Sequence, residues 1–268
     1  HAVPFVPRGA GTGLSGGAVA LDSGVVIECS RLNRILRVDA ENRIALVQPG
    51  VVNADLSKAV APLGLFYAPD PSSQLACTLG GNAAENSGGP HTLKYGTTTN
   101  HVLALELVLP DGEIVRLGSE QGEADGYDLV GAVVGSEGTL GIVTELTVRL
   151  MPSPERSETL LGIFGDVVSA CRAVGDIIKG GLVPAALEIV DRRTIAAVEA
   201  SVYAAGLPTD AGAVLLIELD GPALAVARQV ERVRTLCTAA GAREVSVARD
   251  AEERQRFWRA RKGAFGAM

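Results

Sequence analysis

The sequence predicts an α+β protein of two domains. Short apolar strands separated by tight turns dominate residues 1–152, whereas strands and helices alternate regularly over residues 153–268. The two patterns meet at Met151-Pro152-Ser153-Pro154, where two prolines mark a break between elements. A strand-rich half followed by an alternating half is typical of a chain in which a sheet domain precedes an α/β sandwich.

Turn and cap signals set the elements of the first domain. Asn53 is a favoured helix N-cap, Gly64 is a typical helix end, and Asp111-Gly112 is a favoured hairpin turn. The expected elements are strands over 25–29 and 43–48, a helix over 53–63, a hairpin of strands over 102–109 and 113–117, and a strand over 142–150. We therefore expect a sheet domain with few helices.

The second domain shows a regular alternation of strand and helix patterns. The expected strands cover 158–164, 184–190, 213–219 and 244–248, and the expected helices cover 166–179, 191–204, 222–240 and 250–262. This order predicts a ferredoxin-like α/β sandwich, with helices on one face of a mostly antiparallel sheet.

Composition and charge exclude several classes of partner. The net charge is −7 without a long basic run, so no nucleic-acid partner is expected. No apolar run reaches the length of about 18 residues that a membrane span needs, so no transmembrane segment is expected. The three histidines have no metal-ligand spacing, and no metal site is predicted. The four cysteines form no CxxC pair, which favours reduced thiols in a cytoplasmic protein.

The two ends of the sequence do not resemble natural termini. The sequence begins at His1 without Met, shows no signal peptide, and stops at Met268 directly after a helical pattern. We therefore expect a chain truncated at both ends, in which the first domain lacks its N-terminal part and the second domain its C-terminal part.

A glycine-rich run over residues 7–17 is the most distinctive feature of the first domain. Within it, residues 11–16 match the dinucleotide fingerprint G-x-G-x-x-G. That fingerprint requires a helix that begins inside the motif and runs on to the next strand. Residues 17–24 are too short and too rich in turn residues for such a helix. The context therefore argues against a Rossmann loop.

The same run can bind a pyrophosphate without a helix. Successive glycines allow backbone N–H groups to point into one concavity and hold an anion. The hydroxyls of Thr12 and Ser15 and the charge of Arg8 can add to the binding. A glycine-rich surface loop without a ligand is the alternative for this segment taken alone.

Three further segments change that balance. They cover residues 77–89 (CTLGGNAAENSGG), called the second motif below, residues 68–74 (APDPSSQ), called the third, and residues 135–145 (GSEGTLGIVTE), called the fourth. Together with the glycine-rich run, and in the same order, they resemble the FAD-binding domain of the vanillyl-alcohol-oxidase (PCMH-type) flavoprotein family. The most similar group within it comprises the FAD-binding subunit of glycolate oxidase and the D-lactate and D-2-hydroxyglutarate dehydrogenases.

The resemblance implies a PCMH-type FAD-binding domain followed by a ferredoxin-like substrate, or cap, domain. It also implies which residues contact the cofactor, through backbone amides, close-packed glycines and polar side chains. These residues are Arg8, Gly9, Ala10, Gly11, Thr12, Gly13, Ser15, Gly16, Pro69, Asp70, Thr78, Gly80, Gly81, Asn82, Asn86, Gly88, Gly135, Glu137, Gly138, Gly141, Ile142 and Val143. Thr12 stands where some relatives attach FAD through a histidine, so we expect non-covalent binding.

The resemblance further implies an FAD-dependent oxidoreductase that oxidises a small 2-hydroxy acid of the glycolate or D-lactate type, by hydride transfer to flavin N5. Arg261, in the last expected helix, matches the arginine that binds the substrate carboxylate, a pairing that guanidinium geometry suits. The family's catalytic base and metal segment follow the equivalent of residue 268, so no catalytic residue is assigned. Additional subunits or an electron acceptor protein are expected partners, and the expected location is cytoplasmic, peripheral to the membrane through those partners.

Two other functions stay open. The chain is alternatively a flavin-dependent sugar or alcohol oxidase of the same fold, or a non-catalytic FAD-binding fragment that needs a partner chain. His91 either faces the active site or is an ordinary loop residue, and His101, before an apolar strand, is expected to be structural. Cys77 lies in the second motif without an activating His or Lys nearby, so we do not expect a catalytic thiol.

Overall fold

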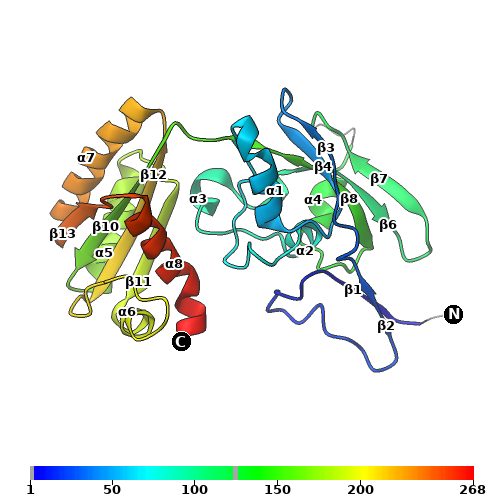
Figure 1. Cartoon of the computed structure of the whole chain (residues 1–268), viewed down its shortest axis with the longest axis horizontal. Helices are drawn as coiled ribbons and strands as arrows, with labels where there is room; N and C mark the ends of the chain where they lie inside the picture. The colour runs from blue at the N-terminus through cyan, green and yellow to red at the C-terminus, as the bar shows by residue number, and fades with distance from the viewer. Residues whose placement is uncertain (1–2, 123–125) are drawn as a thin grey trace. The chain divides into compact units, whose positions relative to one another are not determined.

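The computed structural model describes residues 3–122 and 126–268, so His1 and Ala2, with which the sequence begins, lie outside it. The chain divides into two compact units (Figure 1). The first unit comprises residues up to 91 together with 95–153, and the second comprises residues 92–94 together with 154–268. Each unit contains its own hydrophobic core.

A five-stranded antiparallel sheet forms the framework of the first unit. Its strands, in spatial order, are β3 (Ile35–Asp39), β4 (Ile44–Val47), β8 (Ile142–Arg149), β6 (Val102–Val108) and β7 (Ile114–Gly118). Smaller pairs add β1 (Phe5–Arg8) parallel to β2 (Val25–Glu28), and β5 (Leu65–Phe66) antiparallel to β9 (Met151–Pro152). The expected hairpin is confirmed as β6 and β7, with Gly112 at a φ of 92° in its turn.

Three helices cover one face of this sheet because each presents an apolar side to it. Leu56, Leu79 and Val130, from three different helices, pack with Leu105 and Leu146 of the sheet. The helical segments of the first unit are α1 (Asn53–Val60), the 3₁₀ turn η1 (Ala61–Leu63), α2 (Leu79–Glu85), η2 (Thr98–Asn100) and α4 (Leu129–Val133), whereas α3 (Thr92–Tyr95) consists mostly of residues 92–94 of the second unit. The helix α2 was not predicted, and it lies inside the second motif.

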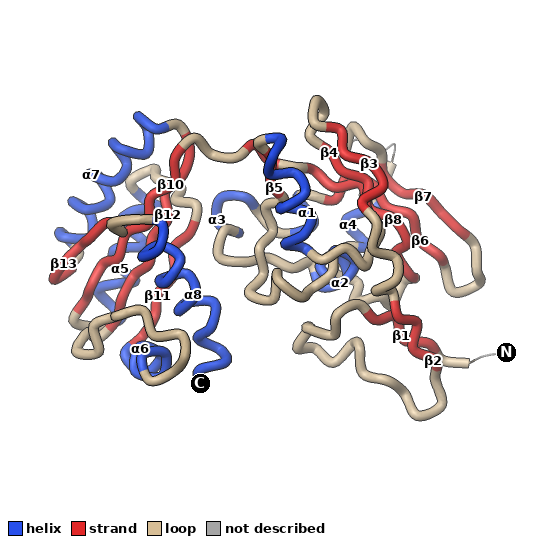
Figure 2. Tube along the Cα trace, in the orientation of Figure 1, coloured by secondary structure: helices blue, strands red, loops and turns tan. Residues whose placement is uncertain are grey.

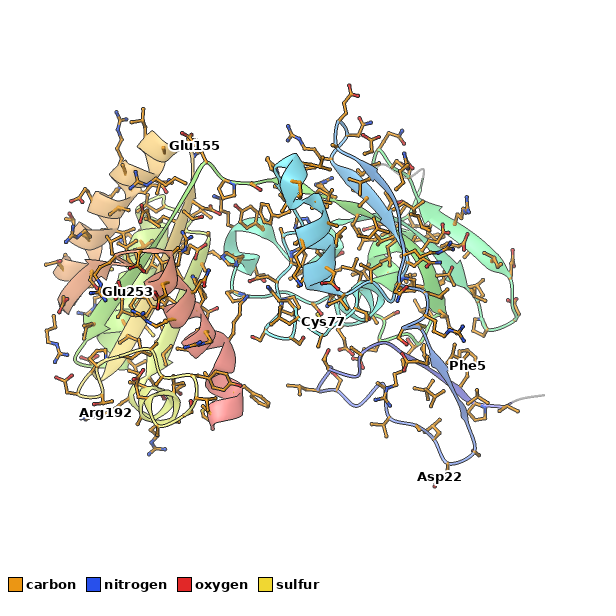
Figure 3. All side chains as sticks on the ribbon, viewed as in Figure 1. Phe5, Asp22, Cys77, Glu155, Arg192 and Glu253 are labelled. Carbon is orange, nitrogen blue, oxygen red and sulfur yellow. The ribbon has the colours of Figure 1, made fainter. Side chains whose placement is uncertain are left out.

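The loop between β1 and β2 contains no helix over residues 9–24, so the rejection of a Rossmann loop is confirmed. Figure 3 shows Phe5 on β1 and Asp22 on the long loop that follows it. The two strands run parallel without a crossover helix between them, which distinguishes this segment from a βαβ unit.

The prediction of Asn53 as an N-cap is wrong. Val52 precedes the first helical turn, and no side chain caps it. Asn53 is instead the first helical residue, and its amide donates hydrogen bonds to Pro69 O and Asn82 Oδ1, both at 2.9 Å. The predicted end of the segment is confirmed, because Gly64 adopts a left-handed φ of 70° after the 3₁₀ turn.

The second unit has the ferredoxin-like topology that the sequence predicts. Its sheet has the order β11 (Ala186–Asp191), β12 (Ala213–Gly221), β10 (Arg156–Phe164) and β13 (Ala242–Val247), with every neighbouring pair antiparallel. Its helices are α5 (Val167–Lys179), α6 (Arg192–Glu199), α7 (Ala223–Ala239) and α8 (Ala251–Ala267). Numbered along the chain, the strands lie in the order 2-3-1-4.

The expectation that the helices share one face of this sheet is wrong. Helices α5 and α7 pack on one face, against a cluster that includes Phe164 and Leu215. Helices α6 and α8 pack on the other face, against Leu161 and Leu216 (Figure 2). The physical reason is that β10 and β12 carry apolar side chains at consecutive positions, so both faces need a cover.

The bounds of two helices also differ from the prediction. Helix α6 ends at Glu199 rather than at residue 204, because the Glu199 carboxylate accepts N–H groups of Ala205 and Leu207 and closes a turn. Helix α8 continues to Ala267, five residues past the predicted end, with Ala264 buried in its last turns.

Candidate functional site

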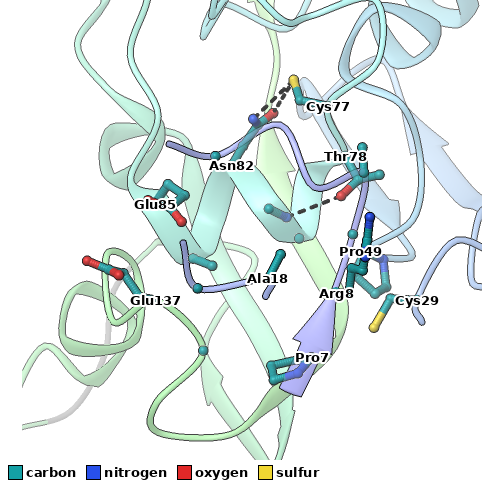
Figure 4. Close-up of a pocket in the computed structure, with 18 of the residues that line it drawn as sticks. Pro7, Arg8, Ala18, Cys29, Pro49, Cys77, Thr78, Asn82, Glu85 and Glu137 are labelled. Carbon is teal, nitrogen blue, oxygen red and sulfur yellow. Dashed lines mark hydrogen bonds between the residues drawn. The ribbon is translucent and has the colours of Figure 1, made fainter. Parts of the chain in front are cut away.

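A cavity of about 400 Å³ lies within the first unit (Figure 4). Its walls come from the loop after β1, from α2 with its flanks, and from the turn before β8. The lining residues are Pro7 to Leu14, Gly17, Ala18, Cys29, Pro49, Ser73, Cys77, Thr78, Gly80, Gly81, Asn82, Ala84, Glu85, Ser87, Val133, Ser136 to Gly138, and Gly141 to Val143. Its volume falls in the range of about 300–1,000 Å³ that is usual for cofactor sites.

All four sequence motifs contribute residues to this cavity, the segment 68–74 through Ser73 alone. The predicted residues that line it are Arg8, Gly9, Ala10, Gly11, Thr12, Gly13, Thr78, Gly80, Gly81, Asn82, Glu137, Gly138, Gly141, Ile142 and Val143. The predicted residues outside its lining are Ser15, Gly16, Pro69, Asp70, Asn86, Gly88 and Gly135. Gly135 lies behind the lining, where its N–H donates to Ala83 O at 2.8 Å and fixes the turn against α2.

Sequence reasoning missed lining residues of two kinds. Glu85 and Ser87 lie inside the second motif, and their polar side chains were a usable signal. Cys29, Pro49 and Val133 come from segments without a motif, and only the sheet topology brings them to the cavity.

The glycine-rich loop is built to receive an anion. The backbone N–H groups of residues 10–15 donate to no other group within the described part of the chain. A Cβ at Gly9 would lie 2.4 Å from Thr78 Oγ1, so the loop approaches the second motif more closely than a side chain permits. Unpaired amides in a tight glycine loop fit a pyrophosphate.

The second motif is held by the first turn of α2. Thr78 caps this helix, with its hydroxyl accepting the Gly81 N–H at 3.3 Å, as the dashed line in Figure 4 shows. Gly80 N–H donates to Pro49 O at 2.8 Å, which ties the helix to the end of β4. The polar side chains Thr78 and Asn82 are both buried and lie in the cavity wall.

Charge is distributed unevenly in the cavity. Arg8 lies with Pro49 and Cys29, whereas Glu85 lies near Glu137 on the other side (Figure 4). Arg8 also faces Glu28 at 3.8 Å, a half-exposed pair that contributes little to stability. The phosphates of a dinucleotide are therefore favoured on the Arg8 side, and hydroxyl or amino groups on the carboxylate side.

Glu137 has a strained backbone at the cavity wall. It is a non-glycine residue with a left-handed φ of 55°, and its N–H donates to Ala84 O at 2.8 Å. Such backbone costs about 1–3 kcal/mol and is retained where the surrounding structure enforces it, commonly at binding sites.

Cys77 and Cys29 are buried thiols in the same wall. Burial and the neighbouring Glu28 carboxylate raise the pKa of Cys29 above its usual range. Cys77 Sγ lies 3.3 Å from Asn82 Nδ2 and takes part in a hydrogen-bond network. The raised pKa of Cys29 disfavours the thiolate that acts as a nucleophile.

His91 contacts the third predicted motif rather than the cavity. Its Nδ1 lies 2.9 Å from Asp70 Oδ2, and both side chains are largely buried. Neither residue belongs to the cavity lining. Asp70 also packs directly against Gly89, so this pair links the 68–74 segment to the end of the second motif.

His101 is buried, as a structural residue would be. Its Nε2 donates to Tyr95 O at 2.8 Å, and its ring meets Tyr67 edge to face. Among the described residues, nothing hydrogen-bonds its Nδ1. Burial, with a smaller contribution from Arg149, lowers the pKa of His101 below 6.5, so the neutral ring is favoured in the folded state.

Lowering the pH is expected to destabilise the first unit through His101. Because its pKa is lower in the folded state, the unfolded chain takes up the proton first. Stability is therefore retained above about pH 6.5 and is lost as the pH falls from there through the folded-state pKa. Urea unfolding followed by circular dichroism measures this loss. His101→Gln keeps a donor for Tyr95 O but does not titrate; an equal pH dependence in both proteins would contradict the prediction.

Arg261 lies on α8 in the second unit. Its Nε donates to Glu188 Oε2 of β11 at 2.6 Å, and its side chain is one-third exposed. A guanidinium can hold a carboxylate in a fork either by Nε with one terminal nitrogen or by its two terminal nitrogens. Glu188 contacts Nε, so it orients the side chain and leaves the edge of the two terminal nitrogens for a substrate carboxylate.

Two kinds of feature are absent from the described residues, a metal-binding cluster and a membrane-spanning helix. Within residues 3–122 and 126–268, no group of three or more His, Cys, Asp or Glu side chains is arranged to hold a metal ion. No helix in the same ranges has the length and apolar character to cross a bilayer.

Comparison with known proteins identifies both units. Residues 1–118 match the family model described as "FAD binding domain". Residues 153–268 match the model described as "FAD linked oxidases, C-terminal domain". The chain belongs to the FAD-linked oxidases, and its cofactor is FAD.

The chain is similar over nearly its whole length to glycolate oxidase subunits and to a D-lactate dehydrogenase. The glycolate oxidase subunit GlcD of Escherichia coli K12 is 50% identical over 266 residues, 99% of this chain and 53% of that protein. Its counterpart in Bacillus subtilis is 47% identical over 100% of this chain and 57% of that protein. A D-lactate dehydrogenase of Anaerostipes hadrus is 37% identical over 99% of this chain and 57% of that protein. The chain spans about half the length of these relatives.

A solved structure supports the fold. An alkyldihydroxyacetonephosphate synthase matches with a TM-score of 0.79 and 24% identity, over 95% of this chain and 50% of that protein. The two family models and this likeness confirm the predicted fold class, a PCMH-type FAD-binding domain followed by a second domain of the FAD-linked oxidases.

Proposed function

We propose that this chain is the FAD-binding part of an oxidoreductase that oxidises a small 2-hydroxy acid of the glycolate or D-lactate type. The cavity carries the proposal, because its unpaired amides, close-packed glycines and single arginine suit a dinucleotide. The similarity to glycolate oxidase subunits and a D-lactate dehydrogenase supports the substrate class. In this proposal residues 1–152 form the cofactor domain and residues 153–268 the substrate domain.

Different residues of the cavity bind different parts of the cofactor. The amides of residues 10–14 and the Arg8 guanidinium hold the pyrophosphate. Gly80 and Gly81 let the backbone of α2 approach the cofactor closely, and Thr78 and Asn82 supply polar contacts. When bound, FAD supplies the two-electron acceptor for oxidation of the substrate α-carbon.

Thr12 bears on the mode of attachment. Its hydroxyl, in the cavity lining, lacks the nucleophilic ring nitrogen of a histidine. We propose that FAD is held without a covalent bond. Acid precipitation is then expected to leave a colourless pellet and a yellow supernatant, and a yellow pellet would overturn this part of the proposal.

Arg261 is the proposed ligand of the substrate carboxylate. Arg261→Ala is expected to raise the 2-hydroxy-acid concentration for half-reduction of the flavin by about 10- to 100-fold, the worth of a charge-assisted hydrogen bond. Because this variant also leaves Glu188 unpaired, Glu188→Gln is measured alone and in combination. Arg259→Ala, an exposed arginine on the same helix, is the matched control.

The test of the whole proposal is an absorbance spectrum followed by anaerobic addition of glycolate, D-lactate and D-2-hydroxyglutarate. The expected result is bleaching of the flavin by one of these acids, with a concentration for half-reduction that is about 10- to 100-fold higher in Arg261→Ala. Bleaching that Arg261→Ala leaves unchanged would instead favour a sugar or alcohol oxidase. FAD uptake without bleaching by any acid would favour a cofactor-binding fragment that needs a partner chain. This alternative is relevant because the chain spans about half the length of the glycolate oxidase subunits it matches.

Partners and location belong to the same proposal. The name of the relatives as a subunit supports further polypeptides or an electron acceptor protein. Cys29, Cys77, Cys171 and Cys237 are all unpaired, which supports a reducing, cytoplasmic setting. Contact with a membrane through partner proteins is compatible with that setting.

A further inference from the structure

We infer that Asn53 is a positioning residue for the FAD cavity, which it does not itself line. Asn53 orients the side-chain amide of Asn82, and Asn82 in turn donates to the Ser87 oxygen. The hydroxyl hydrogen of Ser87 is thereby left to donate to the cofactor. The inference rests on the proposed binding of FAD in this cavity. It gives a function to the residue that the sequence wrongly suggested as a helix cap.

The first step is the orientation of the Asn53 amide. Its Nδ2 donates to Pro69 O at 2.9 Å and to Asn82 Oδ1 at 2.9 Å. A main-chain carbonyl can only accept, so Pro69 O requires that the NH₂ group, and not the oxygen, faces it. The Asn53 side chain is 2% exposed, and its backbone N–H donates to Cys77 O at 3.0 Å. Hydrogen bonds therefore fix both the backbone and the side chain of Asn53.

The second step is the orientation of the Asn82 amide. Because Asn53 presents an NH₂ group, Asn82 must present its oxygen in return, since two facing NH₂ groups would repel. The Asn82 Nδ2 is thereby directed at Cys77 Sγ and Ser87 Oγ, both at 3.3 Å. Figure 4 shows Cys77 and Asn82 side by side, joined by dashed lines. Asn82 is 1% exposed, so water does not compete for these bonds.

The third step concerns Ser87, which lines the cavity. Its oxygen accepts from Asn82, so its own hydrogen remains for another acceptor. Its backbone is fixed from both sides: its N–H donates to Asn82 O at 2.9 Å, and its carbonyl accepts from Thr98 N–H at 3.0 Å and Thr98 Oγ1 at 2.7 Å. A flavin or phosphate oxygen in the cavity is an acceptor that this hydroxyl can reach.

Asn53→Asp tests the two linked hydrogen bonds, Asn53 to Asn82 and Asn82 to Ser87, by exchanging donor and acceptor in each with little change of side-chain shape. The carboxylate that this variant places at position 53 cannot donate, so Asn82 is expected to turn its NH₂ group toward it and its oxygen toward Ser87. Ser87 would then donate to Asn82 and no longer to the cofactor. We expect the Kd for FAD to rise about 3- to 10-fold, the worth of one neutral hydrogen bond, with a shift in the absorption bands of bound flavin.

The controls separate positioning from stability. Ser87→Ala removes the hydroxyl directly, so Asn53→Asp should add less than about twofold to the Kd in that background. Asn82→Asp reverses only the last bond and should reproduce the effect of Asn53→Asp, even if Asn53→Asp itself fails to fold. Asn42→Asp, in the exposed turn between β3 and β4, is the matched control and should leave FAD binding unchanged.

The measurements are quenching of FAD fluorescence on titration and the visible spectrum of the complex. If the wild-type chain fails to bind FAD, the proposed binding fails before the inference is reached. If the wild type binds but Asn82→Asp has an unchanged Kd and flavin spectrum, the inference is wrong. Fully additive effects of Asn53→Asp and Ser87→Ala on the Kd would also overturn it, since they would show that Asn53 does not act through Ser87.

Discussion

Replacing Gly80 by valine is expected to weaken FAD binding by about 10- to 100-fold, the effect of about 1–3 kcal/mol of overpacking. Gly80 lies in the first turn of α2, where an added Cβ would be 2.5 Å from Pro49 Cβ and 3.1 Å from Pro49 O. The proline ring cannot rotate away, and the Gly80 N–H to Pro49 O bond holds the two backbones at that distance. The helix must therefore move, and Gly81 and Asn82 move with it.

The measurement is the Kd for FAD, determined by fluorescence quenching beside the melting temperature of the chain. Gly80→Ala should show a smaller loss in the same direction. Gly175→Ala is the control, because an added Cβ there meets nothing within 4 Å on α5, and it should leave the Kd unchanged. Its stability should rise by about 0.4–1 kcal/mol. Binding of FAD by Gly80→Val within about threefold of the wild type would count against the assignment of α2 to the cavity wall.

The helix α2 itself shows where local sequence signals fail. Two adjacent glycines in its first turn disfavour a helix by about 1 kcal/mol each, so local propensity does not predict a helix there. The structure overrides this propensity because Leu79 and Ala83 reach the core on one side while Gly80 packs on Pro49 on the other. The glycines are required by a contact with a residue thirty-one positions earlier, which no window of sequence reveals.

The second unit was easier to predict because its signals are local. Asp166 and Asp191 cap α5 and α6 through their carboxylates, and the strands between the helices are long apolar runs. The assignment of helices to the two faces was not local, because it depends on which side of β10 each crossover takes. In the same way the four motifs predicted a cofactor loop, but only the fold selects which motif residues line the cavity and which, like Asp70, lie behind it.

Phe164→Ala is expected to cost the second unit about 3–5 kcal/mol of its free energy of unfolding, the usual cost of removing a fully buried phenyl ring. The ring is 1% exposed at the end of β10 and packs in one cluster with Ile177 of α5 and Val233 of α7. No neighbouring helix can close the void without leaving the sheet.

The chain contains a single tryptophan, Trp258 on α8, so its fluorescence during urea unfolding reports this unit alone. Phe265→Ala, on α8 and 74% exposed, is the matched control and should change stability by less than about 0.5 kcal/mol. A loss in Phe164→Ala no larger than that of the control would show that the sheet and the helices α5 and α7 do not share one core.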